Sequence, residues 1–131
     1  MIVLDTHVLI WWVSDPAKLS VKARRVVRDA STRDEVVAST ISIFEIATLV
    51  RRERLRLNVD WDRWLVAVQA IPDFRFAPIT IEIARLAAAF DANFPGDPAD
   101  RLVAATAKAF SARLVTADRR IHAAQVVETV W

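Results

Sequence analysis

The opening stretch "MIVLDTHVLIWWV", Met1 to Val13, decides the fold class of this chain. Its first residues form a short apolar run that ends in Asp5, which predicts a buried β-strand. The run from Thr6 to Val13 fits a short helix, and the breaker Asp15-Pro16 ends it. A strand followed at once by a helix is the start of a βα unit, so a parallel sheet is expected.

The same alternation of short apolar runs and longer helical runs continues to the end of the chain. Further strands are predicted at "EVVAS", "FRFAPI" and "RLVTA", with a terminal strand in "QVVETVW". Further helices are predicted from Ser20 to about Ala30, from about Ser42, from Asp60, after Thr80 and after Asp97, with a short helical turn over Asp118 to Ala123. The expected fold is a three-layer α/β/α domain with a central parallel sheet of four to five strands.

The composition is that of one globular domain spanning residues 1–131. The chain is 54% hydrophobic and 26% charged, with a net charge of +2 and no cysteine, which excludes disulfides and thiolate metal sites. Its longest apolar run near the start is far shorter than the roughly 20 residues of a membrane helix. With no basic leader at the N-terminus, a cytoplasmic protein without a membrane partner is expected.

Four carboxylates stand where strands end and helices begin, and each has an ordinary structural explanation. Asp5 and Asp118 follow strands and can cap the next helix, and Glu45 can complete a capping box with Ser42. In "FPGDPADRLVAATAKAF", residues 94–110, Asp97 precedes a proline and is a strong N-cap. That cap puts Asp100 in the first turn, where the helix dipole favours an anion.

These explanations bring Asp5, Asp100 and Asp118 together, because the strand-to-helix turns of a parallel sheet lie along one edge, and Glu45 joins them if its helix starts beside the first strand. Clustered, partly buried carboxylates repel each other unless a cation lies among them. Because only oxygen ligands are available, a hard cation such as Mg²⁺ or Mn²⁺ is favoured over zinc. His7 and His122 are too few and too scattered for a zinc site.

An acidic metal pocket in an open crevice is typical of phosphoryl chemistry. Nearly all basic residues are arginines, which bind phosphate with a planar fork. The densest cluster contains Arg51, Arg52, Arg54 and Arg56, and it is either a solvated helix end or a nucleic-acid contact. Together these features point towards a metal-dependent nuclease.

Four motifs, in this order and spacing, resemble the PIN-domain ribonucleases, specifically the VapC-type toxins of bacterial toxin–antitoxin pairs. The motifs are "IVLDTHVLIWW", "STISIFEIA", "GDPADRLVAATA" and "LVTADRRI". The resemblance runs over nearly the whole chain and implies a PIN-like fold. It also implies Mg²⁺-dependent endonucleolytic cleavage of RNA by water, leaving 5′-phosphate and 3′-hydroxyl ends.

The resemblance assigns roles motif by motif. The metal-binding and catalytic acids fall on Asp5, Glu45, Asp100 and Asp118. The hydroxyls of Thr6 and Thr116 support them, and Asp97 belongs to the "D-P-x-D-R" pattern and serves chiefly as a cap.

The resemblance also implies partners: a homodimer, and a cognate antitoxin that packs over the toxin and can push a basic side chain into the acidic pocket. The aromatic pair Trp11-Trp12 fits the core, a dimer surface or an antitoxin contact, and the core is the simplest place for one of the two. Trp61 and Trp64 are candidate antitoxin contacts, although core packing explains amphipathic helices as well. The RNA that is cut is not specified.

Other interpretations fit less well. A phosphoacceptor receiver domain needs adjacent carboxylates after the first strand and a late lysine, and a haloacid-dehalogenase phosphatase needs D-x-D where this chain has Asp5-Thr6-His7. A PIN nuclease for RNA processing outside a toxin–antitoxin pair is a closer alternative. A module that only binds nucleic acid or protein would leave the converging carboxylates unexplained.

Overall fold

The computed structural model describes residues 1–131 and has a single five-stranded sheet. Its strands are β1 (Ile2–Leu4), β2 (Val36–Ser39), β3 (Phe74–Ala77), β4 (Arg113–Val115) and β5 (Thr129–Val130). Its α-helices are α1 (Thr6–Ser14), α2 (Val21–Arg33), α3 (Thr40–Arg51), α4 (Trp61–Gln69), α5 (Ile81–Ala89), α6 (Pro98–Ala109) and α7 (Arg119–Ala124), and a 3-10 turn spans Pro16–Lys18. The order β3-β2-β1-β4-β5, with all pairings parallel, confirms the expected sheet.

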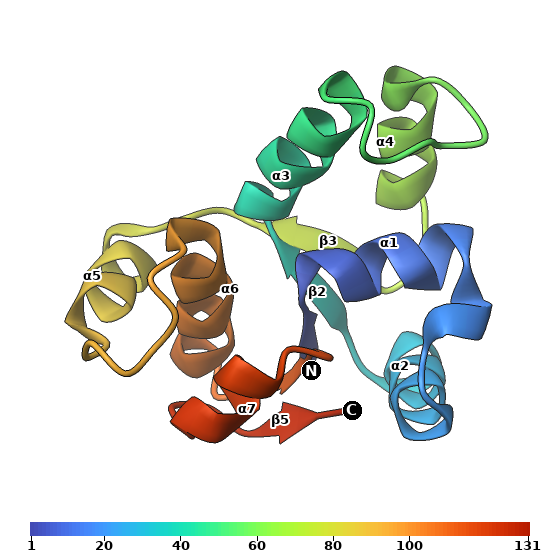
Figure 1. Cartoon of the computed structure of the whole chain (residues 1–131). Helices are drawn as coiled ribbons and strands as arrows, with labels where there is room; N and C mark the ends of the chain where they lie inside the picture. Colours follow the sequence, from blue (N-terminus) through green and yellow to red (C-terminus); the bar gives the residue numbers. More distant parts are fainter.

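Successive residues of β1 supply both faces of this sheet, because side chains alternate along a strand. Ile2 and Leu4 join the core cluster that also contains buried residues of α1, α2 and α4. Val3 joins the cluster formed with α6 and α7 on the opposite face. Figure 1 shows α1 and α2 on one side of the sheet and α6 on the other, so the three-layer α/β/α architecture is confirmed.

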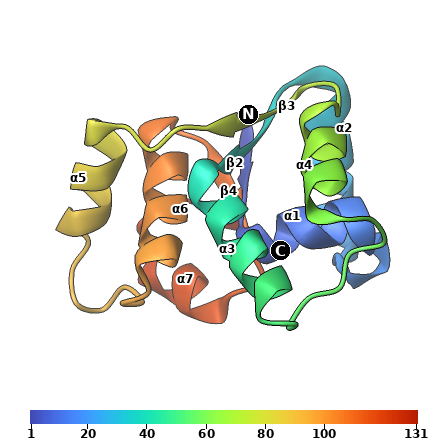
Figure 2. The same cartoon turned by 90° about the horizontal axis from the view of Figure 1, so that it is seen from above.

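Helix α5 lies outside α6, away from the sheet, in both views (Figures 1 and 2). Ile83 and Ala87 of α5 pack against Ala105 of α6 in a small buried cluster. The many alanines of α6 therefore bury that helix between the sheet and α5, since small side chains allow close approach on two sides.

The helix starts follow the predicted caps except at α1, where the Asp5 side chain makes no cap hydrogen bond, and at α3. Ser20, Asp60, Thr80 and Asp97 each accept a hydrogen bond from a backbone N–H of the helix that follows. The third helix, however, begins at Thr40 rather than at about Ser42, and Ser39 is its cap. Strand β2 leads directly into α3 without a loop, so the helix starts as soon as the strand ends.

No helix has both the length and the apolar character needed to cross a bilayer.

Candidate functional site

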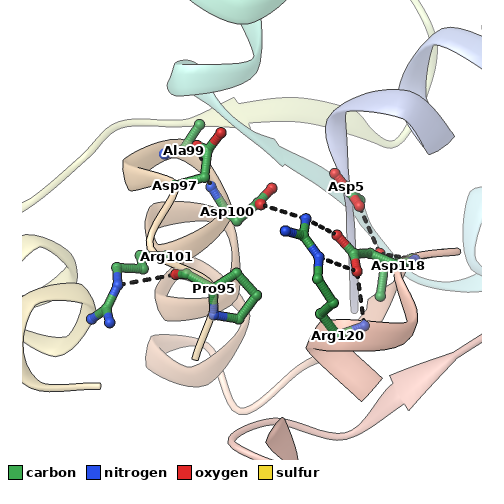
Figure 3. Close-up of polar contacts among 9 residues, drawn as sticks. Asp5, Pro95, Asp97, Ala99, Asp100, Arg101, Asp118 and Arg120 are labelled. Atoms are coloured by element: carbon green, nitrogen blue, oxygen red, sulfur yellow. Dashed lines mark hydrogen bonds and ion pairs between the residues drawn. The ribbon is translucent and has the colours of Figure 1, made fainter. Parts of the chain in front are cut away.

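A cavity of about 400 Å³ opens at the edge of the sheet where β1 and β4 end. Its walls come from the residues after these strands, from α3 and from the start of α6, and α7 closes one side (Figure 3). Five carboxylates line it: Asp5, Glu45, Asp97, Asp100 and Asp118. The other lining residues are His7, Trp11, Ala117 and Arg120. The predicted convergence of the four candidate acids at one edge is present in the structure.

Asp5 does not cap α1, contrary to its structural explanation from the sequence. It occupies the N-cap position, but its side chain makes no cap hydrogen bond. Instead its Oδ2 accepts a hydrogen bond from the Thr116 hydroxyl at 2.6 Å, and both side chains are buried. Burial raises the pKa of the Asp5 carboxyl, and the bond from Thr116 offsets part of that rise. The two residues are brought together by the pairing of β1 with β4.

Glu45 lies in the middle of α3, so the predicted capping box with Ser42 is wrong. The helix begins before Ser42, which leaves Glu45 too far from the first turn to cap it. The hydroxyl of Thr6 donates a hydrogen bond to Glu45 and lies 2.8 Å from the Ser42 hydroxyl. Thr6 of α1 thus holds the glutamate, and Ser42 of α3 holds the Thr6 hydroxyl. Burial is the main cause of a raised Glu45 pKa.

Both aspartates at the start of α6 line the cavity, and Asp97 also caps the helix. Asp97 Oδ1 accepts hydrogen bonds from the backbone N–H of Ala99 at 2.8 Å and of Asp100 at 3.4 Å. Burial, followed by repulsion from Asp5, Asp97, Asp118 and Glu45, raises the pKa of Asp100 to about 7. The capping prediction for Asp97 is confirmed. Asp100 is the carboxyl whose charged form is disfavoured by burial and by the neighbouring acids.

Arg101 holds the loop that positions this helix start, a role that the sequence analysis did not assign. Its guanidinium donates to the backbone carbonyls of Pro95, Ala87, Phe90 and Asp91 at 2.8–3.1 Å. These bonds tie the end of α5 and the following loop to the first turn of α6. The signal was the arginine of "D-P-x-D-R", directly after Asp100.

Asp118 caps α7 as expected, and it is also paired with a residue that sequence reasoning missed. Its Oδ1 accepts from the Arg120 backbone N–H at 2.8 Å. The Arg120 guanidinium donates to both carboxylate oxygens of Asp118, from Nε at 3.2 Å and from Nη2 at 2.8 Å. These bonds lower the pKa of Asp118. Nη2 of Arg120 also lies 3.6 Å from Asp100 Oδ2, so the cation bridges two acids (Figure 3).

The histidines and tryptophans mostly have other roles. His122 is held between the Thr116 carbonyl and the Thr129 hydroxyl, at 2.7 and 2.6 Å, whereas His7 is exposed at the cavity rim. Trp64 is buried in the core, and its indole N–H donates to Ser14 Oγ at 3.1 Å. Trp11 and Trp12 are both only partly buried against the core.

The donor set fits a hard divalent cation. All the carboxylates that line the cavity offer oxygen, and no thiolate exists in the chain. Burial is the largest cause of the raised pKa values of Asp5, Glu45 and Asp100, and repulsion between neighbouring carboxylates adds to it. No three of the acidic side chains are close enough to coordinate one metal ion in this structure, so metal binding would draw them closer together.

Cavity size does not identify this site. A larger cavity of about 590 Å³ lies at the opposite edge of the sheet, beside Met1 and Arg113. Its Asp34 is paired with the amino terminus, and the cavity gathers no comparable set of carboxylates. The chemistry of the lining favours the smaller cavity.

Comparison with known proteins gives matches over nearly the whole chain. Residues 2–127 match the family described as the PIN domain. The chain is 41% identical to Ribonuclease VapC22 of Mycobacterium tuberculosis (strain ATCC 25618 / H37Rv), over 99% of this chain and 98% of that protein. Its fold is similar to that in the crystal structure of VapBC2 from Rickettsia felis bound to a promoter DNA fragment, with a TM-score of 0.73, 13% identity, and 99% and 98% of the two chains covered. A toxin-antitoxin complex from Klebsiella pneumoniae gives a TM-score of 0.69 at 18% identity, covering 100% of this chain and 97% of that one.

Proposed function

The chain belongs to the PIN-domain family, and from this premise we propose that it is a Mg²⁺-dependent endoribonuclease acting as the toxin of a toxin–antitoxin pair. The observation that carries the proposal is the gathering of Asp5, Glu45, Asp100 and Asp118 around one open cavity. Identity to a VapC ribonuclease over nearly the full length of both chains supports it. Residues 1–131 then form one PIN domain.

The four acids hold the ion, with Mg²⁺ preferred and Mn²⁺ able to replace it. A bound divalent ion supplies activation of the attacking water and stabilisation of the charge that develops on the phosphate. The Thr116 hydroxyl keeps Asp5 oriented, and Thr6 does the same for Glu45. Asp97 fixes the first turn of α6 and thereby the direction of Asp100.

The RNA lies in a second cavity, of about 430 Å³, that shares His7, Glu45 and Asp97 with the acidic one. Arg52 and Arg54 line its far side and are exposed. Guanidinium groups next to an acidic metal pocket suit the phosphates that flank a cleaved bond. This favours the nucleic-acid contact over the solvated helix end for the arginine cluster.

The partners follow from the same proposal. A cognate antitoxin covers the site, the toxin forms a homodimer, and the protein acts in the cytoplasm, where cellular RNA is its substrate. The toxin-antitoxin complexes among the structures of similar fold support the antitoxin partner.

Cleavage of RNA by the purified chain tests the enzymatic proposal. With Mg²⁺, the protein is expected to cut cellular RNA, and EDTA is expected to stop cleavage reversibly. Asp100→Asn should be inactive because it removes a ligand charge, whereas Asp29→Asn, an exposed acid on α2, should keep full activity. Turnover that resists EDTA, or an active Asp100→Asn protein, would contradict the proposal.

Expression in cells tests the toxin role separately. Induction of the wild-type chain should arrest growth, and co-expression of a small protein encoded directly upstream should relieve the arrest. Sequencing of the new 5′ ends after a brief induction identifies the RNA that is cut. Equal arrest by the Asp100→Asn chain would show that the arrest does not arise from RNA cleavage.

A further inference from the structure

Arg120 is the only cationic side chain paired with carboxylates of the acidic cavity. It belongs to the first turn of α7, where the helix dipole disfavours a cation and an acidic partner offsets that effect. The partners are Asp118, which it contacts with two nitrogens, and Asp100, which lies 3.6 Å from Nη2. These two acids come from different elements, the turn after β4 and the start of α6 (Figure 3).

The guanidinium and a divalent ion need the same oxygen atoms. A Mg²⁺ ligand lies about 2.0–2.1 Å from the ion, closer than any hydrogen-bond donor approaches. An ion bound by both Asp100 and Asp118 would need the oxygens that Nη2 now faces, and the two positive groups there would repel each other. The two occupants exclude each other.

The side chain of Arg120 is able to leave. It is 68% exposed, while the side chains of Asp100 and Asp118 are 19% and 22% exposed. The carboxylates are thus held in the cavity, and the arginine reaches them from solvent. Its withdrawal would return the guanidinium to water and disturb no core packing.

We propose that Arg120 is a built-in counter-ion that holds Asp100 and Asp118 in the metal-free protein and that a divalent metal displaces on binding. This inference rests on the proposed metal chemistry and adds a residue that sets the affinity for the ion. Arg119, the preceding residue, is exposed and makes no ion pair, so it is the matched control.

Titration of the full chain with Mn²⁺, without RNA, followed by calorimetry or by the electron paramagnetic resonance of free Mn²⁺, tests the proposal. Binding of the ion must break the bonds of the Arg120 guanidinium to Asp118 and its ion pair with Asp100, and loss of such a charge-assisted contact changes an affinity by about tenfold. Arg120→Ala is therefore expected to bind Mn²⁺ about tenfold more tightly than wild type. Arg120→Lys, which keeps the charge but loses the fork, should lie between them. Arg119→Ala should stay within about twofold, because salt screens a charge that remains in solvent.

Nuclear magnetic resonance of the wild-type protein gives a second measurement. The Arg120 Nε–H signal should shift, and its exchange with solvent should accelerate, as Mg²⁺ saturates the site. Unchanged or weaker Mn²⁺ binding by Arg120→Ala, or an unmoved Nε–H signal in the metal-loaded protein, would overturn the inference and leave the proposed function standing. Absence of metal binding by wild type and variant alike would overturn both.

Discussion

Replacing Asp100 by asparagine should make the metal-free protein more stable while removing its activity. In the folded protein, burial and four neighbouring carboxylates raise the pKa of Asp100 from 3.8 to about 7. Asparagine keeps the size of the side chain and never ionises, so it mimics the protonated acid. The change removes the cost of holding a charge in a negative cavity.

The size of the effect follows from the pKa. A rise from 3.8 to about 7 corresponds to about 4 kcal/mol for ionising the folded protein, at about 1.4 kcal/mol per unit. The Asp100 side chain keeps contact with water and with Arg120, and solvent screening reduces the expected gain to about 1–2 kcal/mol above neutral pH.

The pH dependence has a definite sign. Below pH 3.8 the carboxyl is protonated in both the folded and the unfolded chain, and the charge costs nothing. Between pH 3.8 and about 7 the unfolded chain loses its proton first, so the free energy of unfolding falls as the pH rises. The advantage of Asp100→Asn should therefore be largest near pH 8 and shrink towards zero near pH 4.

Urea denaturation in EDTA, at several pH values, measures this difference. Asp29→Asn is the control, because its exposed carboxylate lies outside the cavity and its stability change should be small at every pH. Addition of Mg²⁺ should reverse the order, since the ion stabilises the wild type and not the variant. A metal-free Asp100→Asn protein that is less stable than wild type, or a gain that ignores pH, would refute the electrostatic account of this cavity.

Three further substitutions each remove one of the contacts that support the site or the core. Thr116→Val should lower the free energy of unfolding by about 1–3 kcal/mol and slow RNA cleavage, because it leaves the buried Asp5 carboxylate without its 2.6 Å hydrogen bond. Denaturation measures the first effect and initial cleavage rates measure the second. An unaltered cleavage rate would count against a role of Thr116 in orienting Asp5. Arg101→Lys should cost about 2–3 kcal/mol, since an ammonium cannot reach the four carbonyls that the guanidinium binds, and a melting temperature within a degree of wild type would contradict this clamp. Trp64→Phe should lower the free energy of unfolding by about 1–3 kcal/mol, because the smaller ring fills less of the core and the hydrogen bond to Ser14 is lost. Mg²⁺-dependent RNA cleavage should persist. Loss of cleavage in a folded variant would show that Trp64 has a role beyond core packing.

The sequence by itself determined the order of elements, because short apolar runs and capped helical runs are local signals. Strand β1 and helix α1 are found within one residue of the predicted bounds. Asp97 was identified as a cap from its proline neighbour, and this decided that Asp100 lies in the first helical turn. The parallel sheet then predicted that Asp5, Asp100 and Asp118 share one edge, with Glu45 beside them if its helix starts next to the first strand.

Local signals misled where a helix started without a loop. Ser42 and Glu45 have the spacing of a capping box, yet α3 begins at Thr40, so the same two side chains turn to Thr6 instead. Capping patterns are read within one element. The actual partner of Glu45 is 39 positions away in sequence.

Tertiary structure decided which atoms meet at the site. Asp5 and Thr116 are 111 positions apart and share a hydrogen bond because β1 and β4 pair in register. Arg120 meets Asp100 only because α7 and α6 start at the same edge of the sheet. Spacing along the chain brings carboxylates to a common rim, but the distance between two side chains depends on how separate elements pack. For that reason the sequence located the acidic cluster, and only the folded chain revealed the arginine that it already holds.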